Sequence, residues 1–160
     1  MTDVASPPER SFVVALGSNL GDRHEHLRSA VRAIALLPGT RVERVSELRE
    51  TAPVGGPPQG TYLNGALLLT TPLPPLALLD ALLAIERDHG RERRELNGPR
   101  TLDLDLLWSP GLTLDEPRLT LPHPRLHERR FALEPLVELC PDARSPRDGA
   151  LYADLLAALP

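Results

Sequence analysis

Residues 100–107 read Arg-Thr-Leu-Asp-Leu-Asp-Leu-Leu, an alternation of polar and apolar side chains that includes two acids. Successive side chains of a β-strand point to opposite faces, so this pattern predicts a strand with one apolar face. Asp103 and Asp105 would project side by side, with Cα atoms about 6–7 Å apart. Two carboxylates this close repel each other unless a cation lies between them, and magnesium bound with phosphate is the usual one. The alternative is a half-exposed edge strand with two solvated acids.

Arginines precede this strand, and they favour the metal and phosphate interpretation. Arg91 and Arg93 lie in an arginine-dense segment, and Arg100 follows Pro99 directly ahead of the acids. The planar guanidinium group can bind phosphate oxygens through two hydrogen bonds. An ordinary solvated loop is the alternative, and it is the interpretation preferred for Arg94.

Composition limits the ways in which a phosphate could be held. All 18 basic residues are arginine, so a Walker-type phosphate loop, which needs a lysine, is excluded. The net charge of −4 does not indicate a general nucleic-acid surface. The single cysteine, Cys140, excludes an internal disulfide and a cysteine-based zinc site.

The chain of 160 residues is long enough for one domain with a substantial core. We expect residues 1–10, which are polar and contain proline, to form a flexible N-terminal tail rather than a signal peptide. Residues 11–160 would be a single domain. No segment is long and apolar enough to cross a membrane, so a cytoplasmic protein is expected.

Hydrophobic periodicity predicts strands and helices in the order βαββαβ. The strands are expected at residues 11–16, 41–49, 62–71 and in the two-aspartate segment, with helices from 22 to 37 and from 74 to about 90. This order is the ferredoxin-like split βαβ pattern. It predicts an α+β fold with an antiparallel sheet and helices packed on one face. The C-terminal additions to this core would include helices near 131–139 and 151–159.

Three side chains outside the acidic strand could have a functional role. His123 lies between two prolines, where a structural hydrogen bond and a phosphate contact are both open interpretations. Tyr62 and Asn64 share a face of a predicted central strand, where an amide needs a hydrogen-bonding partner. An aromatic ring beside an amide suits a flat heterocycle, whereas core filling is the alternative for Tyr62.

Taken in order, five segments resemble the 6-hydroxymethyl-7,8-dihydropterin pyrophosphokinases of folate biosynthesis. They are residues 15–23, 50–64, 85–93, 98–107 and 121–136, and they span most of the chain. The segment GPRTLDLDLL (98–107) is the most specific. The resemblance implies the βαββαβ fold and transfer of the β,γ-pyrophosphoryl group of ATP to the pterin hydroxymethyl oxygen, with release of AMP.

The resemblance also implies roles for individual residues. Asp103 and Asp105 would bind two Mg²⁺ ions, and together with Arg91 and Arg100 they would form the catalytic set. The implied ATP-binding positions are Arg91, Arg93, Arg100, Leu106, Arg118, Thr120, His123 and Arg129. The implied pterin-binding positions are Thr51, Ala52, Val54, Tyr62, Asn64 and Phe131, with Glu86 as a supporting acid. The chain departs from the family pattern at Asn97, where tryptophan is frequent, and at Pro124, where tyrosine is frequent.

Two other functions remain as alternatives. Nucleotidyltransferases also combine Gly-Ser with Asp-x-Asp, but there the Gly-Ser lies shortly upstream of the acids, whereas Gly17 and Ser18 belong to a different predicted strand. A ferredoxin-like sensor or RNA-binding module would need aromatic and basic residues on an open sheet face, where this chain places acids. The resemblance implies ATP and hydroxymethyl dihydropterin as partners. No nucleic acid and no membrane are expected, and the expected state is a monomer.

Overall fold

The computed structural model describes residues 8–52, 60–90 and 101–160. An antiparallel sheet of five strands forms its centre, in which β2, β4, β1 and β5 lie side by side in that order and β3 pairs with β4. The strands are β1 (Arg10–Ser18), β2 (Arg41–Val45), β3 (Arg49–Thr51), β4 (Tyr62–Thr71) and β5 (Asp103–Trp108). A separate two-stranded sheet joins β6 (Leu114–Glu116) to β7 (Leu119–Leu121). The expected ferredoxin-like order is confirmed.

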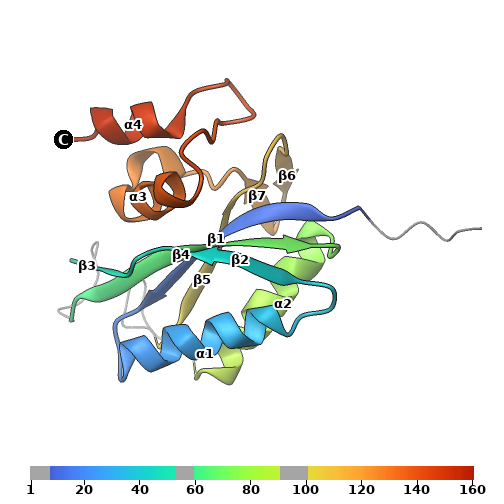
Figure 1. The fold of residues 1–160 in the computed structure, drawn as a ribbon, viewed down its shortest axis with the longest axis vertical. Helices are drawn as coiled ribbons and strands as arrows, with labels where there is room; N and C mark the ends of the chain where they lie inside the picture. Colours follow the sequence, from blue (N-terminus) through green and yellow to red (C-terminus); the bar gives the residue numbers. More distant parts are fainter. Residues whose placement is uncertain (1–7, 53–59, 91–100) are drawn as a thin grey trace, which may run out of the picture.

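Helices cover both faces of the sheet (Figure 1). The two helices of the ferredoxin-like core, α1 (Arg23–Ala35) and α2 (Pro75–Asp88), pack on one face, as expected. The C-terminal additions α3 (Arg130–Leu139) and α4 (Tyr152–Ala158) pack on the other. The sequence explains the helix starts, because the Asp22 side chain accepts a hydrogen bond from Glu25 N at 3.1 Å, and Pro75 occupies the first turn of α2.

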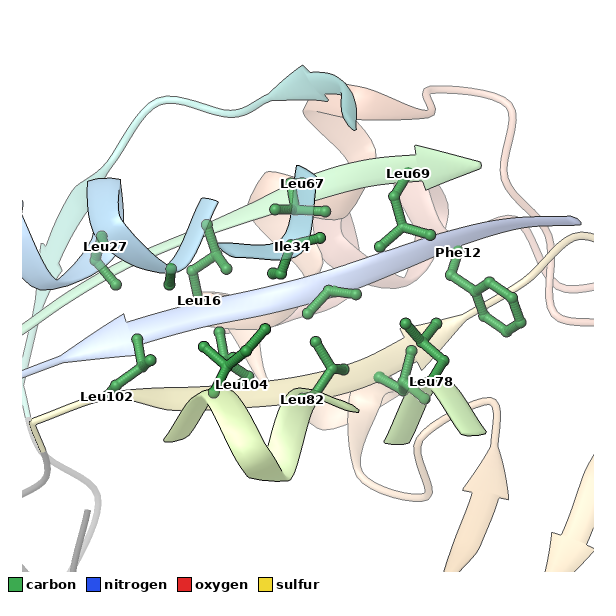
Figure 2. Close-up of a cluster of buried hydrophobic side chains, with 14 of the residues drawn as sticks. Phe12, Leu16, Leu27, Ile34, Leu67, Leu69, Leu78, Leu82, Leu102 and Leu104 are labelled. Atoms are coloured by element: carbon green, nitrogen blue, oxygen red, sulfur yellow. The ribbon is translucent and has the colours of Figure 1, made fainter. Parts of the chain in front are cut away.

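The main hydrophobic core lies between the sheet and the pair α1 and α2 (Figure 2). The strands β1, β4 and β5 contribute alternate side chains, as with Leu102, Leu104 and Leu106 around β5, which are 0–3% exposed. Leu67 and Leu82 in the same core are fully buried. Burial of one such side chain contributes roughly 1.5–3 kcal/mol to the stability of the fold. The buried leucines therefore hold one face of β5 against the core, and the two acids lie on the opposite face.

The segment 41–49 is not the single strand that the sequence predicts. β2 ends at Val45 and β3 begins at Arg49. Between them, Ser46 N–H donates to Ala66 O and Ser46 Oγ accepts from Ala66 N–H, both at 2.8 Å. The serine hydroxyl therefore accepts the Ala66 N–H, which a main-chain carbonyl of the neighbouring strand would accept in a regular ladder. Strand pairing resumes only at Arg49.

Candidate active site

A row of four residues crosses the sheet at the end nearest β3. Arg49 lies opposite Asn64, Asn64 lies opposite Gly17, and Gly17 lies opposite Asp103. Directly opposed residues of antiparallel strands share a face. A Cβ atom built at Gly17 would lie 2.9 Å from Asn64 Oδ1 and 3.8 Å from Asp103 Cβ. Glycine therefore leaves a hollow in the sheet surface between the amide and the carboxylate.

The two acids of β5 lie on one face, as the alternation predicts. Asp103 lies opposite Gly17 and Asp105 lies opposite Ala15, so both carboxylates stand beside small residues of β1. Both side chains are half-buried. Between them, Leu104 N–H donates to the carboxylate of Glu86 in α2 at 2.8 Å, and Glu86 itself is 2% exposed. The main chain between the acids is thus anchored to a buried carboxylate.

The segment that follows β7 forms one wall of the site. His123 N–H donates to Leu107 O at 2.8 Å, which fixes the histidine beside β5. The next turn is the short 3₁₀ helix Leu126–Glu128, and Arg129 immediately precedes α3. Arg125 N–H donates to His123 Nδ1 at 3.2 Å. In the neutral imidazole, Nε2 is then the nitrogen that carries the proton.

Burial lowers the pKa of His123 below its usual value, and the positive charges of Arg129 and Arg125 lower it further. The charge of Asp103 opposes this shift. The histidine is therefore neutral at pH 7 in the protein without ligand. An anion bound among these groups would favour the charged imidazolium instead.

Two aromatic residues and an amide also lie at the site. Tyr62 begins β4 and Phe131 lies in the first turn of α3. The guanidinium carbon of Arg129 lies 5.5 Å from the centre of the Phe131 ring, within the range of a cation–π contact. Asn64 Nδ2 donates to Thr51 Oγ1. The amide is therefore held by β3 while its oxygen lies over Gly17.

These groups line one cavity of about 870 Å³. It brings together nine residues that the sequence analysis singles out: Thr51, Ala52, Tyr62, Asn64, Asp103, Asp105, His123, Arg129 and Phe131. The remaining lining residues are Arg49, Glu50, Arg125, Glu128, Arg130 and Glu134. The cavity therefore has carboxylates at one position, arginines and a histidine on a wall, and two aromatic rings.

Other singled-out residues do not line this cavity. The Leu106 side chain is buried in the core on the opposite face of β5, and Glu86 lies beneath the strand. Arg118 is exposed and pairs with Asp80 of α2, while Thr120 lies in β7. Val54, Arg91, Arg93 and Arg100, together with Arg94 and Asn97, lie outside the residues that the structure describes.

Sequence reasoning missed several lining residues. Arg49 has a usable signal, because it precedes Thr51 by two residues and so shares its strand face. Gly17, which is not a lining residue but lies between Asn64 and Asp103, has no such signal, because its role depends on which strands become its neighbours. Arg125, Arg130 and Glu134 reach the cavity through the path of the chain around the 3₁₀ helix, which local periodicity does not reveal.

The fold and the cavity together define a class of protein: a ferredoxin-like α+β enzyme with a site suited to a phosphorylated molecule and a flat ring. Comparison with known proteins identifies the family. The profile of 7,8-dihydro-6-hydroxymethylpterin-pyrophosphokinase matches residues 13–141. The chain therefore belongs to this family. It is a pyrophosphokinase of folate biosynthesis with ATP as its co-substrate, and the resemblance described above is confirmed.

The sequence is similar to three bacterial proteins named 2-amino-4-hydroxy-6-hydroxymethyldihydropteridine pyrophosphokinase. It is 48% identical to the protein of Pseudomonas aeruginosa over 92% of this chain and 90% of that one. For the protein of Synechocystis the identity is 44%, over 90% and 73% of the two chains. For that of Bacillus subtilis it is 43%, over 79% and 76%.

Solved structures show the same fold at low sequence identity. A crystal structure of HPPK-DHPS in complex with substrates matches with a TM-score of 0.69 and 12% identity, over 94% of this chain and 43% of that one. The HPPK-DHPS of Plasmodium falciparum matches with a TM-score of 0.62 and 13% identity, over 96% and 45%. Among the described residues, no helix has the length and apolar character needed to span a membrane.

Proposed function

We propose that this cavity transfers the β,γ-pyrophosphoryl group of ATP to the hydroxymethyl oxygen of 6-hydroxymethyl-7,8-dihydropterin and releases AMP. One observation carries the assignment of the site. Asp103 and Asp105 lie on one face of β5 and line the same cavity as His123, Arg129 and the ring of Phe131. Few reactions need two carboxylates, cationic phosphate ligands and an aromatic wall within one space.

The donor set fits magnesium. Mg²⁺ is usually held by one or two carboxylates, with water and substrate phosphate oxygens completing its shell. Within the described residues, no group of three or more histidine, cysteine, aspartate or glutamate side chains could hold a metal by itself. Asp103 and Asp105 would therefore hold two Mg²⁺ ions jointly with the triphosphate. Bound magnesium would supply charge neutralisation at phosphorus and would lower the pKa of the attacking hydroxyl.

The wall formed by His123 and Arg129 would bind the triphosphate. The His123 ring donates through Nε2, and the guanidinium supplies paired donors to phosphate oxygens. Arg91, Arg93 and Arg100, which precede β5 in the sequence, would add positive charge where negative charge moves toward AMP. We retain Leu106, Arg118 and Thr120 as proposed contacts to the nucleotide on the family resemblance.

The opposite end of the cavity would bind the pterin. Tyr62 and Phe131 would stack on the two faces of the ring, and Asn64 would bond to its edge. Thr51, Ala52 and Val54 would line the same side. Glu86 would support the site through the main chain of Leu104, whose N–H it accepts.

The reaction then needs mainly positioning. The hydroxymethyl oxygen loses its proton to solvent and forms a bond to the β-phosphorus, while the bond from that phosphorus to the α,β-bridging oxygen breaks. AMP leaves with the negative charge of that oxygen. Because the protein forms no bond to the transferred group, catalysis would come from orientation and from charge neutralisation by the side chains of the cavity.

Product analysis tests the reaction directly. Purified protein is incubated with ATP, magnesium chloride and the pterin, and the nucleotides are separated by ion-exchange chromatography. AMP and the pterin pyrophosphate are expected in equal amounts, and both should disappear when the pterin is omitted. Formation of ADP would indicate transfer of a single phosphoryl group, and release of free pyrophosphate would indicate a nucleotidyltransferase. Either outcome would refute the proposal.

We also propose that the enzyme acts as a monomer in the cytoplasm and that residues 11–160 form one domain. A single chain supplies all the groups that the cavity combines, from β3 and the adjoining Ala52, β4, β5, the segment 123–129 and α3. ATP, the co-substrate of the family, is an intracellular metabolite. Sedimentation of the protein with both substrates present would give the mass of one chain.

A further inference from the structure

Charged contacts join the β2–β3 connection to the end of α3. The Arg44 guanidinium donates to Leu139 O. Glu47 N–H donates to Glu138 Oε2 at 2.9 Å. Arg49 Nη2 lies 2.6 Å from the other carboxylate oxygen of Glu138. The last turn of α3 is therefore held to two neighbouring segments of the sheet edge.

Arg49 extends this set of contacts into the cavity. Its Nε lies 3.6 Å from Glu134 Oε2, and both residues line the cavity. Arg130 Nη1 in turn lies 3.4 Å from Glu134 Oε1. Arg130 Nη2 also donates to the main-chain oxygens of Leu159 and Pro160, at 3.0 and 3.2 Å. A continuous chain of contacts thus runs from β3 across α3 to the end of the protein chain.

Arg49 is well placed to control the pocket proposed for the pterin. It lies opposite Asn64 in the strand register, and it precedes Thr51, which accepts the Asn64 amide hydrogen. β3 has only three residues, and within the described part of the chain it pairs with β4 alone. So short an edge strand gains little stability from its own pairing. Besides the ion pair of Glu50 with Arg23, at 2.6 Å, its position depends on the contacts of Arg49 with α3, the helix that carries Phe131.

These contacts are stronger than ordinary surface ion pairs. The side chains of Arg49, Glu134 and Glu138 are each 33% exposed. Partial burial of Glu138 opposes ionisation, but the hydrogen bond from Glu47 N–H and the Arg49 guanidinium together lower the pKa of its carboxyl group. The carboxylate is therefore charged at neutral pH. One guanidinium that bridges two carboxylates also loses less conformational freedom per contact than an isolated pair.

We propose that Arg49 is a positioning residue that sets the width of the pterin pocket by fixing β3 against α3 through Glu134 and Glu138. This inference rests on the proposed function, because it takes the ring to lie between these two elements. Arg49 acts through Thr51, Asn64 and Phe131, which would contact the ring. It does not act at the reacting phosphorus, which the carboxylates on β5 would face.

Steady-state kinetics of Arg49→Met, Glu138→Gln and the double variant tests the proposal. We expect the KM for the pterin to rise about five- to tenfold in each single variant, as for the loss of one ordinary hydrogen bond. The KM for ATP should change less than about twofold, because ATP binds at the other end of the cavity. The double variant should be no worse than Arg49→Met, since both changes break the same contact. Arg49→Lys should recover part of the affinity.

Arg41→Met is the matched control. Arg41 also lies on a sheet edge and pairs with two carboxylates, those of Glu9 and Glu43, but it does not line the cavity. Its removal should leave both KM values unchanged. Glu138→Gln preserves the shape of the side chain, so it tests the contact between Arg49 and Glu138 even if Arg49→Met unfolds the protein.

Three outcomes would overturn the proposal. The first is an unchanged pterin KM in Arg49→Met and Glu138→Gln. The second is an equal rise of both KM values, which indicates general loosening. The third is an effect of Arg49→Met with none in Glu138→Gln, which would mean that Arg49 contacts the substrate itself. Each outcome is interpreted only if the wild-type protein produces AMP in the same assay. Failure of the wild type to do so would instead refute the proposed reaction.

Discussion

The two faces of β1 differ in how side-chain size changes along the strand. On the face toward α1 and α2, Phe12, Val14 and Leu16 are all large and are at most 1% exposed. On the other face the series is Val13, Ala15 and Gly17, so the side chains shrink steadily toward β3. The large side chains of the first face form a uniform core along the strand. The side chains of the second face form a core at the Val13 end and leave a hollow at the Gly17 end.

The neighbouring strands follow the same gradient. β4 passes from Leu68 through Ala66 to Asn64, and β5 passes from Leu107 to Asp105 and Asp103. At the apolar end, Val13, Ala66 and Leu107 belong to the second core, which α3 and α4 complete. At the polar end the same face is the floor of the cavity. One sheet therefore separates stability from function by face and, on the second face, by position along the strand.

The largest expected effect is that of replacing an acid at the polar end. Asp105→Asn should lower kcat by about a thousandfold, which corresponds to about 4 kcal/mol of transition-state stabilisation. The free energy of unfolding should stay within about 1 kcal/mol of the wild type, because the change removes one of two neighbouring like charges and keeps the side-chain shape. Turnover assays and urea unfolding measure the two quantities. Asp142→Asn, at an exposed position after α3, is the control. Retained turnover in Asp105→Asn would exclude its proposed role.

A change in the core on the opposite face should give the converse result. Leu67 is fully buried in β4, so Leu67→Ala should lower the free energy of unfolding by about 2–5 kcal/mol through lost burial and a cavity. At a temperature where the variant is folded, both KM values should equal those of the wild type. Urea unfolding measures the free energy of unfolding, and steady-state kinetics measures the KM values for ATP and the pterin. Leu36→Ala, at a position that is 84% exposed, should cost far less. A selective change in a KM of Leu67→Ala would show that the two faces are coupled.

The faces also differ in how well the sequence predicts them. β4 has the predicted bounds 62–71, and α1 begins after its predicted cap at Asp22, because strand alternation and helix caps are local signals. The face covered by α1 and α2 follows from such signals directly. The sequence also predicts that the two acids of β5 share a face, because this depends only on the alternation of side chains along a strand.

What the sequence did not predict depends on partners that are distant along the chain. The break between β2 and β3 is caused by Ser46, which bonds to Ala66 of another strand. The hollow at Gly17 exists only because β4 and β5 become its neighbours. The ion pairs of Arg49 with Glu134 and Glu138 require α3 to lie beside β3. Local patterns carry no information on any of these pairings.

The smallest expected effect concerns His123 and the dependence of stability on pH. Its pKa in the folded protein is lower than the ordinary value of 6.5, first through burial and then through Arg129 and Arg125. The unfolded chain therefore binds a proton at a higher pH than the folded protein does. The contribution of this histidine is complete above the ordinary pKa and declines as the pH falls through it. Urea unfolding between pH 7.5 and pH 5 should show this decline as a smaller slope of the free energy of unfolding against pH in His123→Gln than in the wild type. An identical slope in His123→Gln would show that this cavity histidine is no harder to protonate than a solvated one.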